Sequence, residues 1–265
     1  MTGPSRKQRF IDPAANRSLE RGIDILRAFR PGTDLMGNSE LAERVGLPRS
    51  TVSRLTQTLV RVGFLEHDRA SQAYRLAAPV LSLGLAMRMS STILKAAAPL
   101  MQEAAETGRI NVGLAAADRE SMVYLESIRY NRRVSLRRVV TGQRIPIELT
   151  SLGRAYLSTQ TAPEYLAFLA DLRARRPADW RKLAGQIETA FADIRLHGYC
   201  VASWQPGVTA LATPIVLAGH PAYALNVRFA ADGPDATRVA GLGAVLMDLA
   251  GRLMRTLQIP AGGID

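Results

Sequence analysis

One stretch of the chain combines, at helical spacing, the side-chain types that contact nucleic acid. Guanidinium groups bind phosphates and guanine edges, and short hydroxyls and amides bind phosphates and base edges in a major groove. The residues of this kind are Arg49, Ser50, Thr51, Ser53, Arg54 and Gln57. The apolar residues between them, at the i, i+3, i+7 spacing of one helical face, are Val52, Leu55, Leu59 and Val62. The polar set is therefore expected on the opposite, solvent-facing side of a helix.

The residues before this helix predict a shorter helix and a tight turn. Asn38 or Ser39 is expected to cap the start of the shorter helix. Gly46 is expected to end it, because glycine adopts the left-handed backbone conformation without strain. Pro48 then suits the first turn of the next helix. Two helices joined in this way form a helix-turn-helix. A plain helical hairpin with a solvated polar face would have the same pattern.

The flanking segments favour the helix-turn-helix over the plain hairpin. Phe64–Asp68 and Ala73–Leu76 are short strand patterns around a polar turn, with Arg69 near its tip. This is the pattern of a wing, in which Arg69 is placed to contact a phosphate or the minor groove. A first helix, Ser18–Phe29, is predicted before the motif. Ser18 is expected to cap this helix, and the side chains expected to face inward are Leu19, Ile23 and Leu26.

These segments resemble the IclR family of bacterial transcriptional regulators. Ser18–Leu26 resembles the first-helix motif of that family, and Ser39–Leu55 is similar to its helix-turn-helix nearly residue for residue. The resemblance extends to the C-terminal helix and is strongest before Gly84. It implies binding to double-stranded operator DNA, assembly as a homodimer or a dimer of dimers, and a GAF-like C-terminal domain that binds a small effector.

Length and composition allow two ordinary domains with real cores. The chain has 265 residues, of which 47% are hydrophobic and 22% charged. The formal net charge of +11 favours polyanionic partners, with nucleic acid ahead of an anionic membrane surface, although such a charge also arises from solubility alone. We expect a disordered arm over 1–17, a winged helix-turn-helix domain over 18–79, a linker helix over 80–92 and an effector-binding domain over 93–260.

Several classes of protein are disfavoured by what the sequence lacks. Cys200 is the one cysteine, and three histidines have no ligand spacing, so we expect no disulfide framework, no metal and no cofactor. The N-terminus lacks a signal-peptide core, and no apolar run is long enough to span a membrane, which favours a cytoplasmic protein. No nucleophile, phosphate-loop or HExxH motif appears, so we do not expect an enzyme.

The second half predicts an α+β domain, an antiparallel sheet flanked by helices. The expected strands are 111–116, 122–126, 133–140, one entered through 197–201, 208–217 and 222–230. The expected helices are 93–106, 150–158, 163–172, 179–196 and 234–257. Before them, the predominantly apolar helix Ala77–Ser90 corresponds to the helix that pairs subunits in the family, and it would equally suit a plain connection packed on its own chain.

The family resemblance also implies an effector site. It places Ser151 and Leu152 at a pocket, just before Gly153 and at a helix start, where free N–H groups favour a carboxylate. Ala210 stands where relatives often carry a cysteine. Asn226 and Arg228 share one face of a later strand by the period of two and would point into the same pocket.

Arg228 departs from the family pattern, in which a small hydroxyl is common at this point. A buried guanidinium needs an anionic partner, which favours a small organic acid as the effector. The alternatives are an internal ion pair, with Glu126, Glu148 or Asp193 as the acid, and an exposed arginine. Tyr124, Tyr156 and Trp204 are candidates for an apolar pocket wall or for plain core. At the level of the protein, the alternative is a ligand-independent DNA-binding architectural protein whose C-terminal domain only oligomerises.

Overall fold

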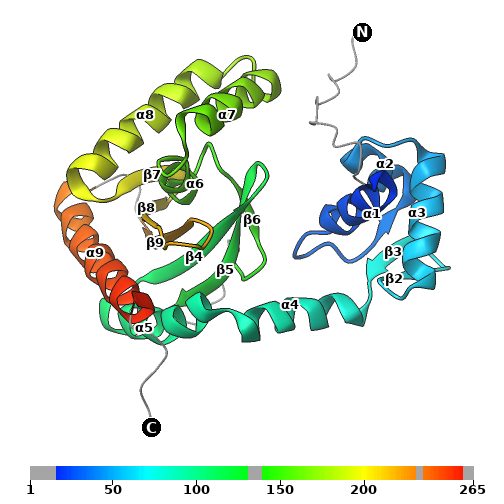
Figure 1. The fold of residues 1–265 in the computed structure, drawn as a ribbon, viewed down its shortest axis with the longest axis horizontal. Coiled ribbons are helices and arrows are strands. Elements are labelled where there is room, and N and C mark those ends of the chain that lie inside the picture. Colours follow the sequence, from blue (N-terminus) through cyan, green and yellow to red (C-terminus); the bar gives the residue numbers. More distant parts are fainter. Residues whose placement is uncertain (1–15, 131–138, 231–234, 259–265) are drawn as a thin grey trace. The chain divides into compact units, whose positions relative to one another are not determined.

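The computed structural model describes residues 16–130, 139–230 and 235–258. It comprises two compact units, Met1–Met87 and Arg88–Asp265, here called the first and second units (Figure 1). Each unit combines helices with an antiparallel sheet, so the α+β, two-domain fold class is confirmed. The boundary between the units falls within one helix, α4 (Ala78–Ser90).

The first unit is a helix-turn-helix followed by a β-hairpin. Its elements are α1 (Arg17–Ala28), β1 (Met36–Gly37), α2 (Asn38–Val45), α3 (Arg49–Arg61), β2 (Leu65–Asp68) and β3 (Ala73–Leu76). The three strands pair antiparallel in the order β1-β3-β2. One core joins helices and sheet, with Ile25, Leu41, Val52 and Leu65 fully or almost fully buried.

Helix α1 differs in detail from the sequence expectation. Asn16, rather than Ser18, caps it, because its side-chain oxygen accepts hydrogen bonds from the backbone N–H groups of Ser18 and Leu19, both at 3.1 Å. The expected inward face was also wrong. Leu19 is 62% exposed and Ile23 41% exposed, since the packed face of α1 is that of Gly22, Ile25 and Ala28; Leu26 is half-buried.

The caps and ends of the other two helices were also placed slightly wrongly. Gly37 is the N-cap of α2, so neither Asn38 nor Ser39 caps it, and Pro48 is the N-cap of α3 rather than part of its first turn. Val62 is 55% exposed, because the helix ends at Arg61 and the chain no longer follows the helical stripe. Leu55 and Leu59 are half-buried against the core as expected.

The second unit has three layers, with helices on both faces of a six-stranded sheet. The strands are β4 (Asn111–Asp118), β5 (Ser121–Arg129), β6 (Arg144–Pro146), β7 (Cys200–Gln205), β8 (Val208–Ile215) and β9 (Tyr223–Ala230). They pair antiparallel in the order β6-β5-β4-β9-β8-β7. The helices are α5 (Thr92–Gly108), α6 (Ser151–Leu157), α7 (Ala162–Arg175), α8 (Trp180–His197) and α9 (Ala236–Gln258).

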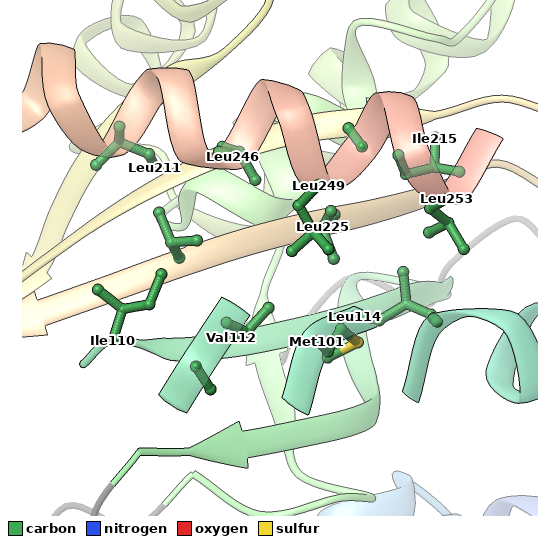
Figure 2. Packing of buried hydrophobic residues seen from close by; sticks show 14 of the residues in the cluster. Met101, Ile110, Val112, Leu114, Leu211, Ile215, Leu225, Leu246, Leu249 and Leu253 are labelled. Atoms are coloured by element: carbon green, nitrogen blue, oxygen red, sulfur yellow. The ribbon is translucent and has the colours of Figure 1, made fainter. Parts of the chain in front are cut away.

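Successive side chains along each strand point to opposite faces of the sheet, so this unit has two cores, one on each face. On one face, Val112, Leu225 and Val227 pack against α5 and α9, and Figure 2 shows Leu246 and Leu249 of α9 facing the apolar side chains of the strands. On the other face, Leu152 of α6 and Ile187 of α8 pack in one cluster with strand residues such as Ala115. The second face also carries the polar side chains described below.

One expected strand cannot be located. Residues 131–138 of the predicted strand 133–140 lie outside the described residues, and Val139 and Val140 belong to no strand. Residues 1–15 of the expected arm likewise lie outside them, whereas Arg17 already begins α1. The structure adds two very short strands, β1 and β6, which the sequence did not predict.

Candidate functional site

The outer face of α3 carries the side chains that the sequence predicted to contact DNA. Arg49, Ser50, Arg54 and Gln57 are exposed, and Thr51 and Ser53 are half-buried. Neither Arg49 nor Arg54 forms an ion pair with another described residue. Their guanidinium groups are therefore available for an external anion.

The inner face of α3 and the preceding turn hold this surface in place. Val52 is fully buried, and the hydroxyl of buried Thr56 donates to the Val52 carbonyl oxygen at 3.0 Å, so this polar group is satisfied within the helix. Gly46 ends α2 with a φ of +65°, a left-handed conformation that favours glycine. The structure thus has the two helices and the turn of a helix-turn-helix.

The hairpin β2–β3 has a hydrogen-bonded tip. The Asp68 carboxylate accepts hydrogen bonds from the backbone N–H of Ser71 at 2.9 Å and from Arg75 Nη2 at 2.7 Å. The Ser71 backbone hydrogen bond is the largest of the effects that hold the pKa of Asp68 below its ordinary value. Arg69 is exposed next to this carboxylate, at the turn. The tip therefore presents an arginine on a locally fixed backbone.

In the second unit, the α6 face of the sheet contains a narrow cavity of about 20 Å³, roughly the space of one water molecule, beneath a wider open mouth. All five residues that the sequence assigned to an effector site line it: Ser151, Leu152, Ala210, Asn226 and Arg228. Ser151, Leu152 and Asn226 are buried to 2% exposure or less. Tyr124 and Trp204 also line the cavity, whereas Tyr156 is not among its lining residues.

One end of this cavity, called the polar end here, is formed by Tyr124, Asn226 and Arg228. Asn226 Nδ2 donates to the Tyr124 hydroxyl at 3.3 Å, and the Arg228 guanidinium lies 5.5 Å from the centre of the Tyr124 ring. Arg228 Nη2 donates a long hydrogen bond to the Ser127 hydroxyl at 3.4 Å. Burial raises the pKa of Tyr124, so its hydroxyl keeps its proton at neutral pH.

Several polar atoms at this end have no protein partner. Arg228 Nε, Asn226 Oδ1 and Asn111 Oδ1 are buried and form no hydrogen bond within the described residues. Asn111 and Arg228 are directly paired across β4 and β9. Because a buried polar group left unpaired costs about 1–3 kcal/mol, these atoms mark a place where a ligand could supply the missing partners.

Two of the three acids that the sequence offers as partners of Arg228 bind other arginines, and the third, Asp193, forms no ion pair with a described residue. Glu126 accepts from Arg88 Nη2 at 2.6 Å, and Glu148 accepts from Arg176 Nε at 2.7 Å. Within the part of the chain that the structure describes, Arg228 has no carboxylate at ion-pair distance. The internal ion pair considered from the sequence is thus not formed by these acids.

Comparison with known proteins decides the family. Residues 18–69 match the IclR helix-turn-helix domain, and residues 86–253 match the domain described as bacterial transcriptional regulator IclR C-terminal. The chain belongs to the IclR family. This family consists of DNA-binding transcriptional regulators and not of enzymes, which confirms the non-enzymatic interpretation of the sequence.

Individual IclR relatives agree with this assignment. The regulator TsaQ1/TsaQ2 of Comamonas testosteroni is 34% identical over 69% of this chain and 66% of its own length. A solved IclR-family regulator from Brucella abortus is 32% identical, with a TM-score of 0.86 over 95% of this chain and 96% of that one. An IclR homolog from Microbacterium hydrocarbonoxydans, complexed with 4-hydroxybenzoate, shares the fold at 22% identity, a TM-score of 0.65 and coverage of 91% and 99%.

Some of the IclR-type pocket was missed in the sequence. Gly113 on β4 is needed for the polar end, since a Cβ there would lie 2.5 Å from the Tyr124 ring and 2.6 Å from Asn226 Oδ1. Thr150 and Val208 are wall residues without any distinguishing pattern. Only the strand register, in which Gly113 faces Asn226, brings these residues together.

Across the described residues, no helix is long and apolar enough to cross a membrane.

Proposed function

We propose that this protein is a sequence-specific regulator whose affinity for double-stranded operator DNA is set by a small organic carboxylate bound in the second unit. One observation carries the proposal: Arg228 lines a cavity, has a buried Nε without a partner, and lacks a carboxylate partner among the described residues. Arginine keeps its charge at physiological pH and binds carboxylates in a bidentate geometry.

The other lining residues would define the shape and polarity of the ligand. Asn226 Oδ1 lacks a donor, so a hydroxyl on the ligand would complement it. Ser151, Leu152 and Ala210 would form the wall against the rest of the molecule. The homolog from Microbacterium hydrocarbonoxydans, complexed with 4-hydroxybenzoate, supports the idea that this fold can hold a small carboxylate.

On the DNA side, we propose that Arg49, Ser50, Thr51, Ser53, Arg54 and Gln57 enter the major groove. Arg69 would contact a phosphate or the minor groove from the wing. A single helix-turn-helix covers only a short half-site, so we propose a homodimer or a dimer of dimers acting in the cytoplasm. Effector binding and DNA binding would be thermodynamically coupled. The effector would bind one arrangement of the assembly better than another, and it would thereby raise the population of that arrangement.

The experiment compares acids with neutral analogues of the same shape. The protein first selects its operator from a pool of random DNA, and binding is then measured with 4-hydroxybenzoate, benzoate and their amides. An acid should change operator affinity, whereas its amide should not. In Arg228→Ala the response should be lost. In the control Arg195→Ala, an exposed arginine of α8 that lines neither pocket, the response should persist.

A wider panel of small carboxylates extends the same test. If only uncharged ligands change operator binding, or if the response of Arg228→Ala equals that of the wild type, the carboxylate proposal is wrong. If no small molecule stabilises the protein or alters DNA binding, the evidence favours the alternative, an architectural DNA-binding protein whose second unit only oligomerises.

A further inference from the structure

A second pocket lies between α8 and the edge strand β7, apart from the polar end described above. Its volume is about 340 Å³, and its mouth is open to solvent. The polar or aromatic residues that line it are Arg154, Gln186, Thr189, Asp193, Ser203 and Trp204. Arg154 and Asp193 are the charged members of the described lining. Their surroundings indicate what the pocket could bind.

Arg154 is a buried cation with neutral partners. The residue is 8% exposed. Its Nε donates to the Glu148 carbonyl oxygen at 3.2 Å, and its Nη2 donates to Gln186 Oε1 at 2.6 Å. Within the described residues, Nη1 has no hydrogen-bond partner and no carboxylate lies at ion-pair distance. Burial lowers the pKa of Arg154, as expected for a charge without a counterion.

Asp193 is the complementary group at the other end of the pocket. It is half-buried, and its carboxylate forms no ion pair or hydrogen bond with other described residues. It follows Gln186, the partner of Arg154, by seven residues on the same helix. Two turns of helix separate such residues by about 10 Å along the axis. The pocket therefore has an unneutralised cation near one end and an unneutralised anion near the other.

We propose that this second pocket binds a linear zwitterion, whose carboxylate contacts Arg154 and whose ammonium group contacts Asp193. Each charge of the protein would gain the opposite charge that it lacks, and the chain of the ligand would lie along Ala190 and Trp204. Ala202 and Trp204 line both pockets, so the two ligands would share one wall, but the anchoring residues differ.

The test uses ω-amino acids of graded length on the full-length protein. Binding of glycine, 4-aminobutanoate and 6-aminohexanoate is measured by calorimetry and by thermal shift, with hexanoate and hexylamine as analogues that lack one charge. We expect saturable binding of one of the longer zwitterions and at least tenfold weaker binding of both single-charge analogues. Asp193→Asn should weaken zwitterion binding at least tenfold and leave hexanoate binding unchanged.

Variants of Arg154, and of Arg228 in the pocket beside α6, complete the experiment. Arg154→Lys should retain zwitterion binding because it keeps the charge, whereas Arg154→Gln should lose it. Asp193 is half-buried, so Asp193→Asn tests the proposal even if Arg154→Gln does not fold. Arg228→Ala should bind the zwitterion like the wild type. The proposal is overturned if no zwitterion binds at millimolar concentration, if Asp193→Asn binds it equally well, or if Arg228→Ala abolishes binding.

Discussion

Arg49 and Arg54 are the residues in which the proposed DNA contact can be tested most directly, since both are exposed on α3 without an ion-pair partner among the described residues. If Arg54 binds a base edge, Arg54→Ala should weaken operator binding by about 1–3 kcal/mol and relax preference at one position. If it binds only phosphate, affinity should fall for all sequences alike and the salt dependence should become shallower. Arg69→Ala in the wing should behave in this second way.

Gel shifts over a salt series, with operator and scrambled DNA, distinguish these outcomes. Arg195→Ala serves as the control, because it removes one positive charge from an exposed site in the second unit. Unchanged operator affinity in both Arg49→Ala and Arg54→Ala would show that α3 is not the recognition helix.

Asp68 makes a pH-dependent contribution to the hairpin tip. Its pKa is lowered in the folded protein, chiefly by the Ser71 backbone hydrogen bond. The ionised Asp68 carboxylate therefore stabilises the folded protein fully above the unfolded-state pKa, near 3.8. This stabilisation is lost as the pH falls through the lower pKa of the folded state. Asp68→Asn should lower the melting temperature of the protein at pH 7, and the difference from wild type should narrow as the pH approaches 3. Glu43→Gln, at an exposed residue without a side-chain partner among the described residues, should show little difference at either pH.

At the scale of the element, α6 depends on a glycine that cannot be replaced. A Cβ on Gly153 would overlap the backbone of Ile147, which cannot move aside as the end of a side chain can. Gly153→Ala should therefore destabilise the second unit by about 1–3 kcal/mol or more, measured by denaturant unfolding. Gly185→Ala is the matched control. A Cβ there meets no atom within 4 Å, so this helical substitution should be neutral or stabilise by up to about 1 kcal/mol.

Elements specified by local residue patterns were predictable, and elements specified by distant partners were not. The left-handed Gly46 and the polar face of α3 lie within a few residues of one another, and the helix-turn-helix followed from them. Strand β6 has three residues and exists through its pairing with β5, which no local pattern reveals. The exposure of Leu19 has the same origin, because the neighbours of α1 determine which of its apolar faces is covered.

The proposed effector pocket beside α6 likewise contains residues that local patterns reveal and residues that only distant pairing brings in. Asn226 and Arg228 share a face through the period of a strand, so the sequence placed them together. Ser151 and Leu152 came from the family resemblance, not from spacing. Gly113 reaches the site only through the pairing of β4 with β9, and its sequence neighbours give no indication of it.

At the scale of the whole molecule, α4 is the element most in need of a partner. None of its residues is buried, and its large side chains are strongly exposed: Leu81 77%, Leu83 59%, Leu85 55%, Met87 47% and Met89 67%. Leu81, Leu85 and Met89 share one face of the helix by the i, i+4 spacing, and exposed apolar side chains grouped in this way are characteristic of a protein interface. Because paired DNA half-sites require a symmetric assembly, we expect α4 to bury this surface against a second copy of the chain.

Replacing two of these leucines tests the assembly and its link to DNA binding together. The double variant Leu81→Ser, Leu85→Ser should lower the oligomeric mass measured by light scattering at micromolar concentration. It should also weaken operator binding more than tenfold, since each half-site would then be bound independently and without the gain from linkage. Leu166→Ser on α7, 64% exposed and outside α4, should change neither property. A wild-type protein that is monomeric at this concentration and still binds its operator at full affinity would contradict the expectation that paired subunits bind the DNA.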